Sequence, residues 1–173
     1  MRILGVDPGL QTTGYGLIEA TSGRLVLLEG GVVRTDAKLS LDRRLIALYE
    51  GISAVMKEFQ PDCLALEELY SKYEHPRTAI LMGHARGTIL LAAGQLGVTY
   101  CGYEASLVKK SLTGNGRATK TQVAHMVCHL LGLSTPPSPE DVTDALALAV
   151  CHASPMRLTS HTRNLDHLTG GRR

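Results

Sequence analysis

The spacing of the apolar residues first changes to a helical period near residue 40, and this change constrains the fold more than any other feature. Before it, three β-prone segments at 3–7, 14–20 and 24–34 follow one another, separated only by Asp-Pro-Gly and Ser-Gly turns. Connections this short can join only antiparallel neighbours, because a parallel crossover needs a dozen or more residues. The first 34 residues are therefore predicted to form an antiparallel meander.

After residue 40 the apolar residues recur at helical spacing, interrupted by short apolar strands. Leucine, isoleucine, valine and phenylalanine side chains between residues 41 and 59 repeat at three- and four-residue steps, and Gln60-Pro61 ends that helix. The elements predicted from there on are helix 41–59, strand 62–68, helix 76–96, strand 98–104, helix 119–131 and helix 138–153. Thr119 and Gln122 are spaced as a capping box, and Ser138 is the expected N-cap of the last helix.

A meander followed by alternating strands and helices is typical of an α/β fold with a mixed five-stranded sheet and helices on both faces. With 173 residues, one such domain is expected over 1–155, followed by a flexible basic tail at 156–173. No apolar run approaches a membrane span, and no signal-peptide layout opens the chain. The four cysteines show no Cys-x-x-Cys pair, which favours reduced thiols and a cytoplasmic protein without membrane contact.

Acidic side chains stand where three of these predicted elements begin or end. Asp7 ends the first strand, Glu67 and Glu68 end the strand at 62–68, and Asp141 and Asp144 lie three apart on one face of the last helix. Ligands collect outside the carboxyl ends of strands in such sheets. Carboxylates that converge there would suit Mg²⁺ or Mn²⁺, and two such ions can clamp the attacking and leaving oxygens of a phosphodiester.

Several of these acids also have a plainer interpretation. Asp7 fits a simple Asp-Pro-Gly turn, and Asp141 is a favourable acid in the first turn of a helix. Asp144 is harder to explain in this way, because the rest of its helix face is apolar and an unpaired carboxylate beside a core is costly.

Alternation along the strands separates Glu67 from its neighbour. Side chains alternate between faces, so Asp7 shares a face with Gly5, and Glu67 shares a face with Ala65. Small residues on that face would let a helix carrying Ala145 approach closely. Glu67 is therefore expected to join Asp7, with Glu68 on the opposite face.

Basic residues cluster in the second half of the chain. Residues 105–139 contain Lys109, Lys110, Arg117 and Lys120 and no acidic residue, which suits a surface that grips a polyanion, although a solvated charged surface is the alternative. Arg77 is expected either to reach DNA or to form a surface salt bridge with Glu74. Gly83-x-x-x-Gly87 permits close approach of another backbone, either within the chain or across a homodimer.

Five segments together resemble the RuvC-type Holliday junction resolvases over about residues 2–152. They read Gly-Val-Asp-Pro-Gly-Leu-Gln-Thr-Thr-Gly-Tyr-Gly, Leu-Ala-Leu-Glu-Glu, Gly-His-Ala-Arg-Gly, Thr-Lys-Thr-Gln-Val-Ala-His-Met-Val and Asp-Val-Thr-Asp-Ala-Leu-Ala-Leu-Ala. The resemblance implies an RNase H-like fold, a homodimer, and metal-dependent cutting of two opposed strands of a four-way DNA junction in recombination and repair. It also implies a branch-migration motor of the RuvA and RuvB type as partner.

The resemblance assigns roles residue by residue. Asp7, Glu67, Asp141 and Asp144 match the family's acidic tetrad, which implies two Mg²⁺ ions per site, with Mn²⁺ as a substitute. Lys109 and Lys120 match its junction-contacting lysines, and Tyr70 falls where the family carries an aromatic residue that touches the junction centre. Two other functions remain open: a non-catalytic junction-binding protein, and a single-lobe actin-like ATPase, suggested by the glycine-rich segment after Asp7.

Overall fold

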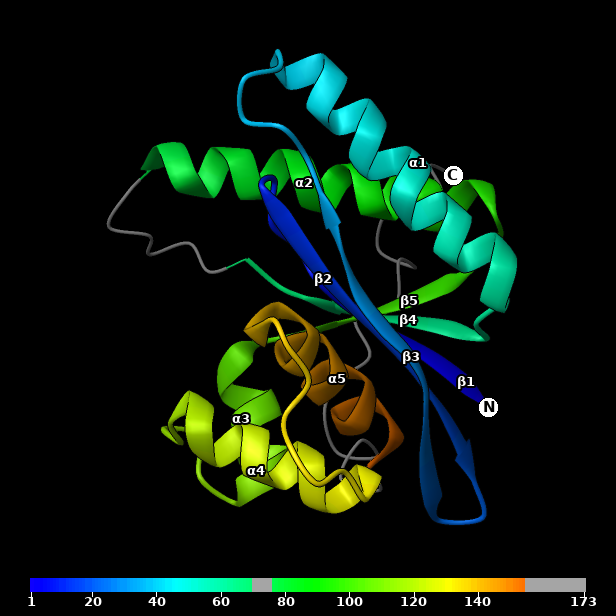
Figure 1. Cartoon of the computed structure of the whole chain (residues 1–173), viewed down its shortest axis with the longest axis vertical. Coiled ribbons are helices and arrows are strands. Elements are labelled where there is room, and N and C mark those ends of the chain that lie inside the picture. Colours follow the sequence, from blue (N-terminus) through cyan, green and yellow to red (C-terminus); the bar gives the residue numbers. More distant parts are fainter. Residues whose placement is uncertain (70–75, 155–173) are drawn as a thin grey trace, which may run out of the picture.

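The computed structural model describes residues 1–69 and 76–154, which form one five-stranded sheet between two layers of helices (Figure 1). The strands are β1 (Arg2–Asp7), β2 (Thr12–Thr21), β3 (Arg24–Arg34), β4 (Cys63–Glu67) and β5 (Thr99–Tyr103). The helices are α1 (Leu41–Phe59), α2 (Pro76–Gln95), α3 (Ala105–Thr113), α4 (Lys120–Leu131) and α5 (Glu140–Ala153). The predicted fold class, a mixed five-stranded sheet with helices on both faces, is confirmed.

Strand order brings the carboxyl ends of β1 and β4 together. The sheet runs β3-β2-β1-β4-β5, with β1 antiparallel to β2 and parallel to β4. In the parallel pair Gly5 lies opposite Ala65 and Val6 opposite Leu66. Asp7 and Glu67, the next residues on the two strands, therefore leave the sheet side by side at the same edge.

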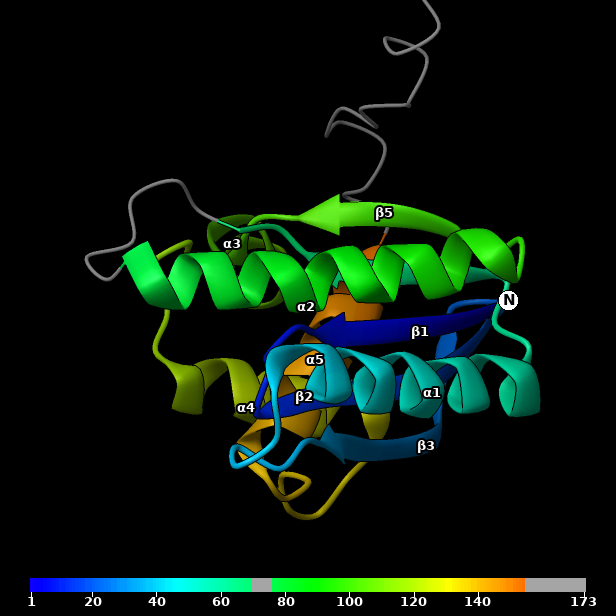
Figure 2. The same ribbon diagram turned by 90° about the horizontal axis from the view of Figure 1, so that it is seen from above.

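The two faces of the sheet are covered by different helices. Helices α1 and α2 lie together over one face, as the view from above shows (Figure 2), and bury Ile52 and Ile89 against Leu4 and Leu64. Helices α3, α4 and α5 cover the other face, where Leu146 packs with Ile3 and Ile18. Alternate side chains of β1 thus enter separate cores, as the period of two requires.

Helix α5 lies unusually close to the sheet because glycines form the surface beneath it. A Cβ atom at Gly5 would collide with the carbonyl oxygen of Ala145, and one at Gly14 would collide with the carbonyl oxygen of Asp141. The expected close approach of the helix that carries Ala145 is therefore present. It holds the first turns of α5 directly against the carboxyl end of β1.

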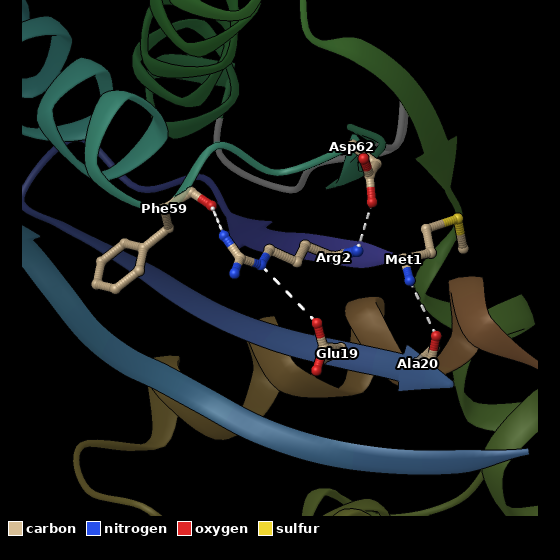
Figure 3. Close-up of polar contacts among 6 residues, drawn as sticks. All are labelled: Met1, Arg2, Glu19, Ala20, Phe59 and Asp62. Carbon is tan, nitrogen blue, oxygen red and sulfur yellow. Dashed lines mark hydrogen bonds and ion pairs between the residues drawn. The ribbon is translucent and has the colours of Figure 1, made fainter. Parts of the chain in front are cut away.

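The start of β1 is anchored at the end of the strand opposite Asp7 (Figure 3). The Arg2 amide donates to Asp62 Oδ2 at 2.6 Å, and its guanidinium donates to the Phe59 carbonyl oxygen at 3.0 Å. The amino group of Met1 donates to the Ala20 carbonyl oxygen at 3.0 Å. These bonds hold the start of β1 to β2 and to the turn between α1 and β4.

A buried histidine joins α5 to two strands. His152 is 1% exposed; its Nε2 lies 3.0 Å from Cys63 Sγ and its Nδ1 lies 2.7 Å from the Tyr103 hydroxyl. Cys63 begins β4 and Tyr103 ends β5. One side chain therefore ties the end of α5 to the two strands on the far side of β1.

The ends of several elements shift by one or two residues from the sequence-based prediction, and β4 ends at Glu67, so that Glu68 lies just past the strand. Two further features differ. Helix α3 occupies residues for which no element was predicted; it is a nine-residue helix with only Val108 and Leu112 buried, too short for a clear periodic signal. Helix α5 begins one residue later than expected: Pro139, not Ser138, is the N-cap, because Pro139 is itself extended with ψ 173°. Asp141 is consequently the second helical residue, not the third.

Parts of the prediction fall outside what the structure describes. Tyr70 and the predicted tail at 156–173 lie outside the described residues. No helix among the described residues is long and apolar enough to cross a membrane.

Candidate active site

A pocket of about 300 Å³ opens at the carboxyl ends of β1 and β4, where α3, α4 and α5 meet the sheet. It combines acids from the two strands and α5 with basic residues from α3 and α4. Its lining residues are Asp7, Glu67, Met82, Ala105, Val108, Lys109, Lys120, Val123, Asp144, Ala147 and Leu148. Three of the four predicted tetrad acids and two of the predicted DNA-contacting lysines thus share one cavity.

Asp7 and Glu67 form a half-buried carboxyl pair in this pocket. Burial raises the pKa of Asp7 to about 8, helped by the negative charge of Glu67, by a hydrogen bond between the two groups and by the charges of Asp144 and Asp141. Burial also raises the pKa of Glu67, against the opposing effect of that hydrogen bond. Two close carboxylates resist ionising together. The raised pKa values therefore favour one proton shared by the pair near neutral pH.

Asp144 lines the same pocket and forms an ion pair with Lys120. Its Oδ2 accepts a hydrogen bond from Lys120 Nζ at 2.7 Å, and this contact raises the pKa of Lys120. Ala145 and Leu148 beside it are buried, so Asp144 stands at the rim of the core, as its position in the helix predicted.

The negative charge of Asp141 also acts on Asp7, but Asp141 does not line the pocket. It sits in the first turn of α5 above Gly14, and its charge contributes to the raised pKa of Asp7. The structure therefore brings Asp7, Glu67 and Asp144 around the cavity and leaves Asp141 at its margin.

Glu68 points away from these acids. Its carboxyl group lies over Gly102 on β5, where an added Cβ would touch it. Gly102 pairs with Leu66, so Glu68 is on the Leu64 and Leu66 face, as strand alternation predicted.

The other predicted DNA-contacting residues lie outside the pocket. Lys110, Arg117 and Arg77 are exposed: Lys110 near the end of α3, Arg117 in the turn before α4, and Arg77 at the start of α2. Lys109 and Lys120 line the pocket together with the acids, whereas Lys110, Arg117 and Arg77 lie elsewhere on the surface.

Arg86 was not assigned a role from the sequence, although it lies in the Gly-His-Ala-Arg-Gly segment. Its Nε donates to the carbonyl oxygen of Glu67 at 3.1 Å, so α2 fixes the backbone at the end of β4. Met82, one turn earlier on α2, lines the pocket. The position of Arg86 between Gly83 and Gly87 on a predicted helix could have drawn attention to it, but only the fold shows that it contacts the end of β4.

The donor set fits divalent cations. Carboxylate oxygens are the ligands that Mg²⁺ and Mn²⁺ prefer. Burial first, and then the charges of Glu67, Asp144 and Asp141, raise the pKa of Asp7, and a cation bound to these acids would favour its ionised form. Within residues 1–69 and 76–154, no three His, Cys, Asp or Glu side chains are already grouped closely enough to hold a metal. One of these acids already has a positively charged partner within the chain, because the Lys120 ammonium contacts Asp144.

Comparison with known proteins identifies relatives over most of the chain. A family model described as crossover junction endodeoxyribonuclease RuvC matches residues 3–152. A protein of that name from Rhodopirellula baltica is 49% identical over 149 residues, covering 86% of this chain and 84% of the relative. Another, from Desulforamulus reducens, is 46% identical over 153 residues, covering 88% and 93% of the two chains.

Solved structures give the same result. The RuvC of T. thermophilus, in complex with Holliday junction substrate, matches with a TM-score of 0.85 and 34% identity, covering 91% of this chain and 96% of that one. The yeast mitochondrial Holliday junction resolvase Ydc2 matches with a TM-score of 0.60 over 87% of this chain and 78% of that one. At 12% identity, the second match indicates a shared fold alone.

Proposed function

The chain belongs to the RuvC family of crossover junction endodeoxyribonucleases, and from this membership and its pocket we propose that it resolves Holliday junctions by cutting their strands. The fold is RNase H-like. The observation that carries the proposal is the meeting of Asp7, Glu67 and Asp144 with Lys109 and Lys120 around one cavity. Acids positioned to hold cations, beside lysines positioned to hold phosphate, are the requirements of phosphodiester hydrolysis.

We propose that Asp7, Glu67 and Asp144 hold divalent cations in this pocket, with Asp141 as the fourth acid. Bound there, two Mg²⁺ or Mn²⁺ ions would lower the pKa of a water molecule and neutralise the charge that develops on the phosphate. Both strand carboxylates must be ionised to act as ligands, so binding of a cation would release the proton that the raised pKa of Asp7, about 8, favours on this pair. Arg86 holds the Glu67 backbone, and thereby the carboxylate, in place.

DNA binding is assigned to the basic residues. Lys109 and Lys120, which line the pocket, would bind the phosphates next to the scissile bond and hold the backbone against the acids. Lys110, Arg117 and Arg77 would contact phosphates farther from it, because each is exposed but lies away from the cavity. Tyr70 is proposed from the resemblance alone to stack at the junction centre.

A homodimer is proposed from the outer face of α2. Ile80 and Leu91 are 61% and 56% exposed on that helix, with Gly87 between them. The prediction left open whether Gly83 and Gly87 admit a close approach within the chain. Nothing in the described part of the chain lies within 4 Å of a Cβ added at Gly87, which supports a second copy as the partner. A two-fold axis would present two pockets to opposed strands.

The remaining expectations follow from the family. A branch-migration motor of the RuvA and RuvB type is proposed as partner, and the cytoplasm as the site of action; Cys101, Cys128 and Cys151 are free thiols, which suits a reducing compartment. A purely junction-binding protein would gain nothing from buried carboxylates next to phosphate. The actin-like ATPase is set aside, because the family model spans residues 3–152 as a nuclease.

Cleavage of a synthetic four-way junction tests the function. The wild-type protein should cut two opposed strands with Mg²⁺ or Mn²⁺ and should not cut with EDTA, and a linear duplex of the same sequence should remain intact. Asp7→Asn should abolish cutting while junction binding stays equal or becomes tighter, because a negative charge beside phosphate is removed. Cutting by Asp7→Asn at the wild-type rate would disprove the assignment of this pocket.

A further inference from the structure

Lys120 lines the pocket, but the proposed function does not explain its ion pair with Asp144. Its ammonium lies 2.7 Å from Asp144 Oδ2 and 3.9 Å from Glu140 Oε2, so it pairs with the acids of α5, whereas the proposed function asks it to bind phosphate. The contact joins the first residue of α4 to the second turn of α5. It occupies an oxygen of one of the three acids that line the cavity.

An ammonium and a metal ion compete for the same carboxylate oxygen. A lysine amine that donates to Asp144 is no metal ligand, because it is protonated and carries the same sign of charge as the metal. The ion pair is also easily broken: the Lys120 side chain is 68% exposed, and exposed pairs of this kind contribute little to stability. The singly charged Lys120 ammonium is therefore weakly held on a carboxylate that would bind a divalent metal ion more strongly.

We propose that the Lys120 ammonium takes the place of the cation on Asp144 while the site is free of metal, and that metal binding displaces it toward the DNA. This inference rests on the proposed function, because it assumes that Asp144 is a metal ligand. The same lysine cannot hold Asp144 and a phosphate at once. Loading of the metal would thus release a positive charge for the DNA backbone, and the two binding events would favour each other.

Lys109 provides the matched comparison. It lines the same pocket, and its charge opposes the rise in the pKa of Glu67, as does that of Lys120. Among the described residues, however, no carboxylate lies within ion-pair distance of Lys109. Removing Lys109 therefore changes only the electric field in the pocket. Removing Lys120 changes that field and also breaks the ion pair with Asp144.

Titration of the DNA-free protein with Mn²⁺, followed by calorimetry, tests the competition. Wild type, Lys120→Gln and Lys109→Gln should be compared, with circular dichroism as the check on folding. Lys120→Gln should bind Mn²⁺ severalfold more tightly than Lys109→Gln. Lys120→Arg, which can still pair with Asp144, should bind as wild type does.

The outcomes separate the two proposals. Equal Mn²⁺ affinities for Lys120→Gln and Lys109→Gln would overturn the displacement of Lys120 while leaving the metal site intact. Weaker binding by Lys120→Gln than by wild type would overturn it as well, since the lysine would then help the metal to bind. Cleavage that needs no divalent metal would instead disprove the metal site of the proposed function.

Discussion

Gly5 on β1 lies directly beneath Ala145 on α5, so near that a single added carbon at Gly5 would overlap the Ala145 carbonyl oxygen. This contact sets the distance between two acids of the candidate site. Asp7 follows Gly5 by two residues on the strand, and Asp144 precedes Ala145 on the helix. The two acids line one pocket because glycine lets the helix backbone rest on the strand backbone.

Gly5→Ala should therefore damage both stability and activity. The colliding atom belongs to backbone, which cannot rotate away, so α5 must move, and overpacking of this kind costs about 3 kcal/mol or more. Chemical unfolding would measure the loss, and junction cleavage should fall with it. Gly94→Ala on α2 is the control: nothing described lies within 4 Å of its added Cβ, so stability should rise by up to about 1 kcal/mol. A Gly5→Ala protein as stable as wild type would show that α5 does not depend on this close approach.

The features that the sequence predicts correctly are those set by local periodicity. Helix 41–59 agrees to the residue with α1, and the capping box at Thr119 and Gln122 is present in α4. Alternation along β4 also separates Glu67 from Glu68 correctly, because no bulge interrupts the parallel ladder between β1 and β4. Where one residue's position follows from its neighbours, sequence reasoning succeeds.

The features that it misses depend on contacts between distant segments. Helix α3 buries too few residues to show a period, and its stability comes from packing on α4 and α5. In the sequence His152 is an ordinary residue at the end of a helix, and nothing predicts that its ring lies between Cys63 and Tyr103. Likewise, the pairing of Lys120 with Asp144 joins residues 24 positions apart, which no spacing rule connects.

Glu67→Gln and Glu68→Gln form a matched pair of neighbouring substitutions. Glu67 lines the pocket and shares a hydrogen bond with Asp7, whereas Glu68 lies over Gly102 on the opposite face. Glu67→Gln should remove metal-dependent junction cleavage, and Glu68→Gln should retain most of it. Initial cleavage rates at saturating Mg²⁺ decide between them; a reversed result would transfer the proposed ligand to Glu68.

The raised pKa of Asp7 predicts how stability depends on pH without metal. Its pKa rises from 3.8 to about 8 on folding, so between these values the folded protein binds more protons than the unfolded chain, and stability falls as pH increases. Unfolding by urea in EDTA should therefore show wild type losing stability relative to Asp7→Asn between pH 5 and pH 9. The relative loss should be on the order of a few kcal/mol, because one proton costs about 1.4 kcal/mol for each pH unit between the two pKa values. Parallel pH profiles for the two proteins would mean that Asp7 ionises normally.

His152→Ala should destabilise the protein far more than the same change at His129. The His152 ring is buried between Cys63 Sγ and the Tyr103 hydroxyl, so its removal leaves a cavity and polar groups without this contact, a loss of about 3 kcal/mol. His129 is exposed on α4, and its replacement should change stability by no more than about 0.5 kcal/mol. Thermal melts of the two variants provide the comparison, and similar melting temperatures would show that the buried contacts contribute little.

Lys109→Ala should weaken junction binding mainly through the loss of a phosphate contact. A lysine that neutralises a phosphate releases a counterion, so its removal should lower the slope of log affinity against log salt concentration by about one unit. Lys57→Ala is the control, because Lys57 is exposed in the last turn of α1, on the face of the sheet opposite the helix that carries Lys109. Binding would be measured by fluorescence anisotropy at several salt concentrations, with EDTA present to prevent cutting. If Lys109→Ala keeps the wild-type slope, its side chain lines the pocket without contacting DNA, and its charge acts only on Glu67.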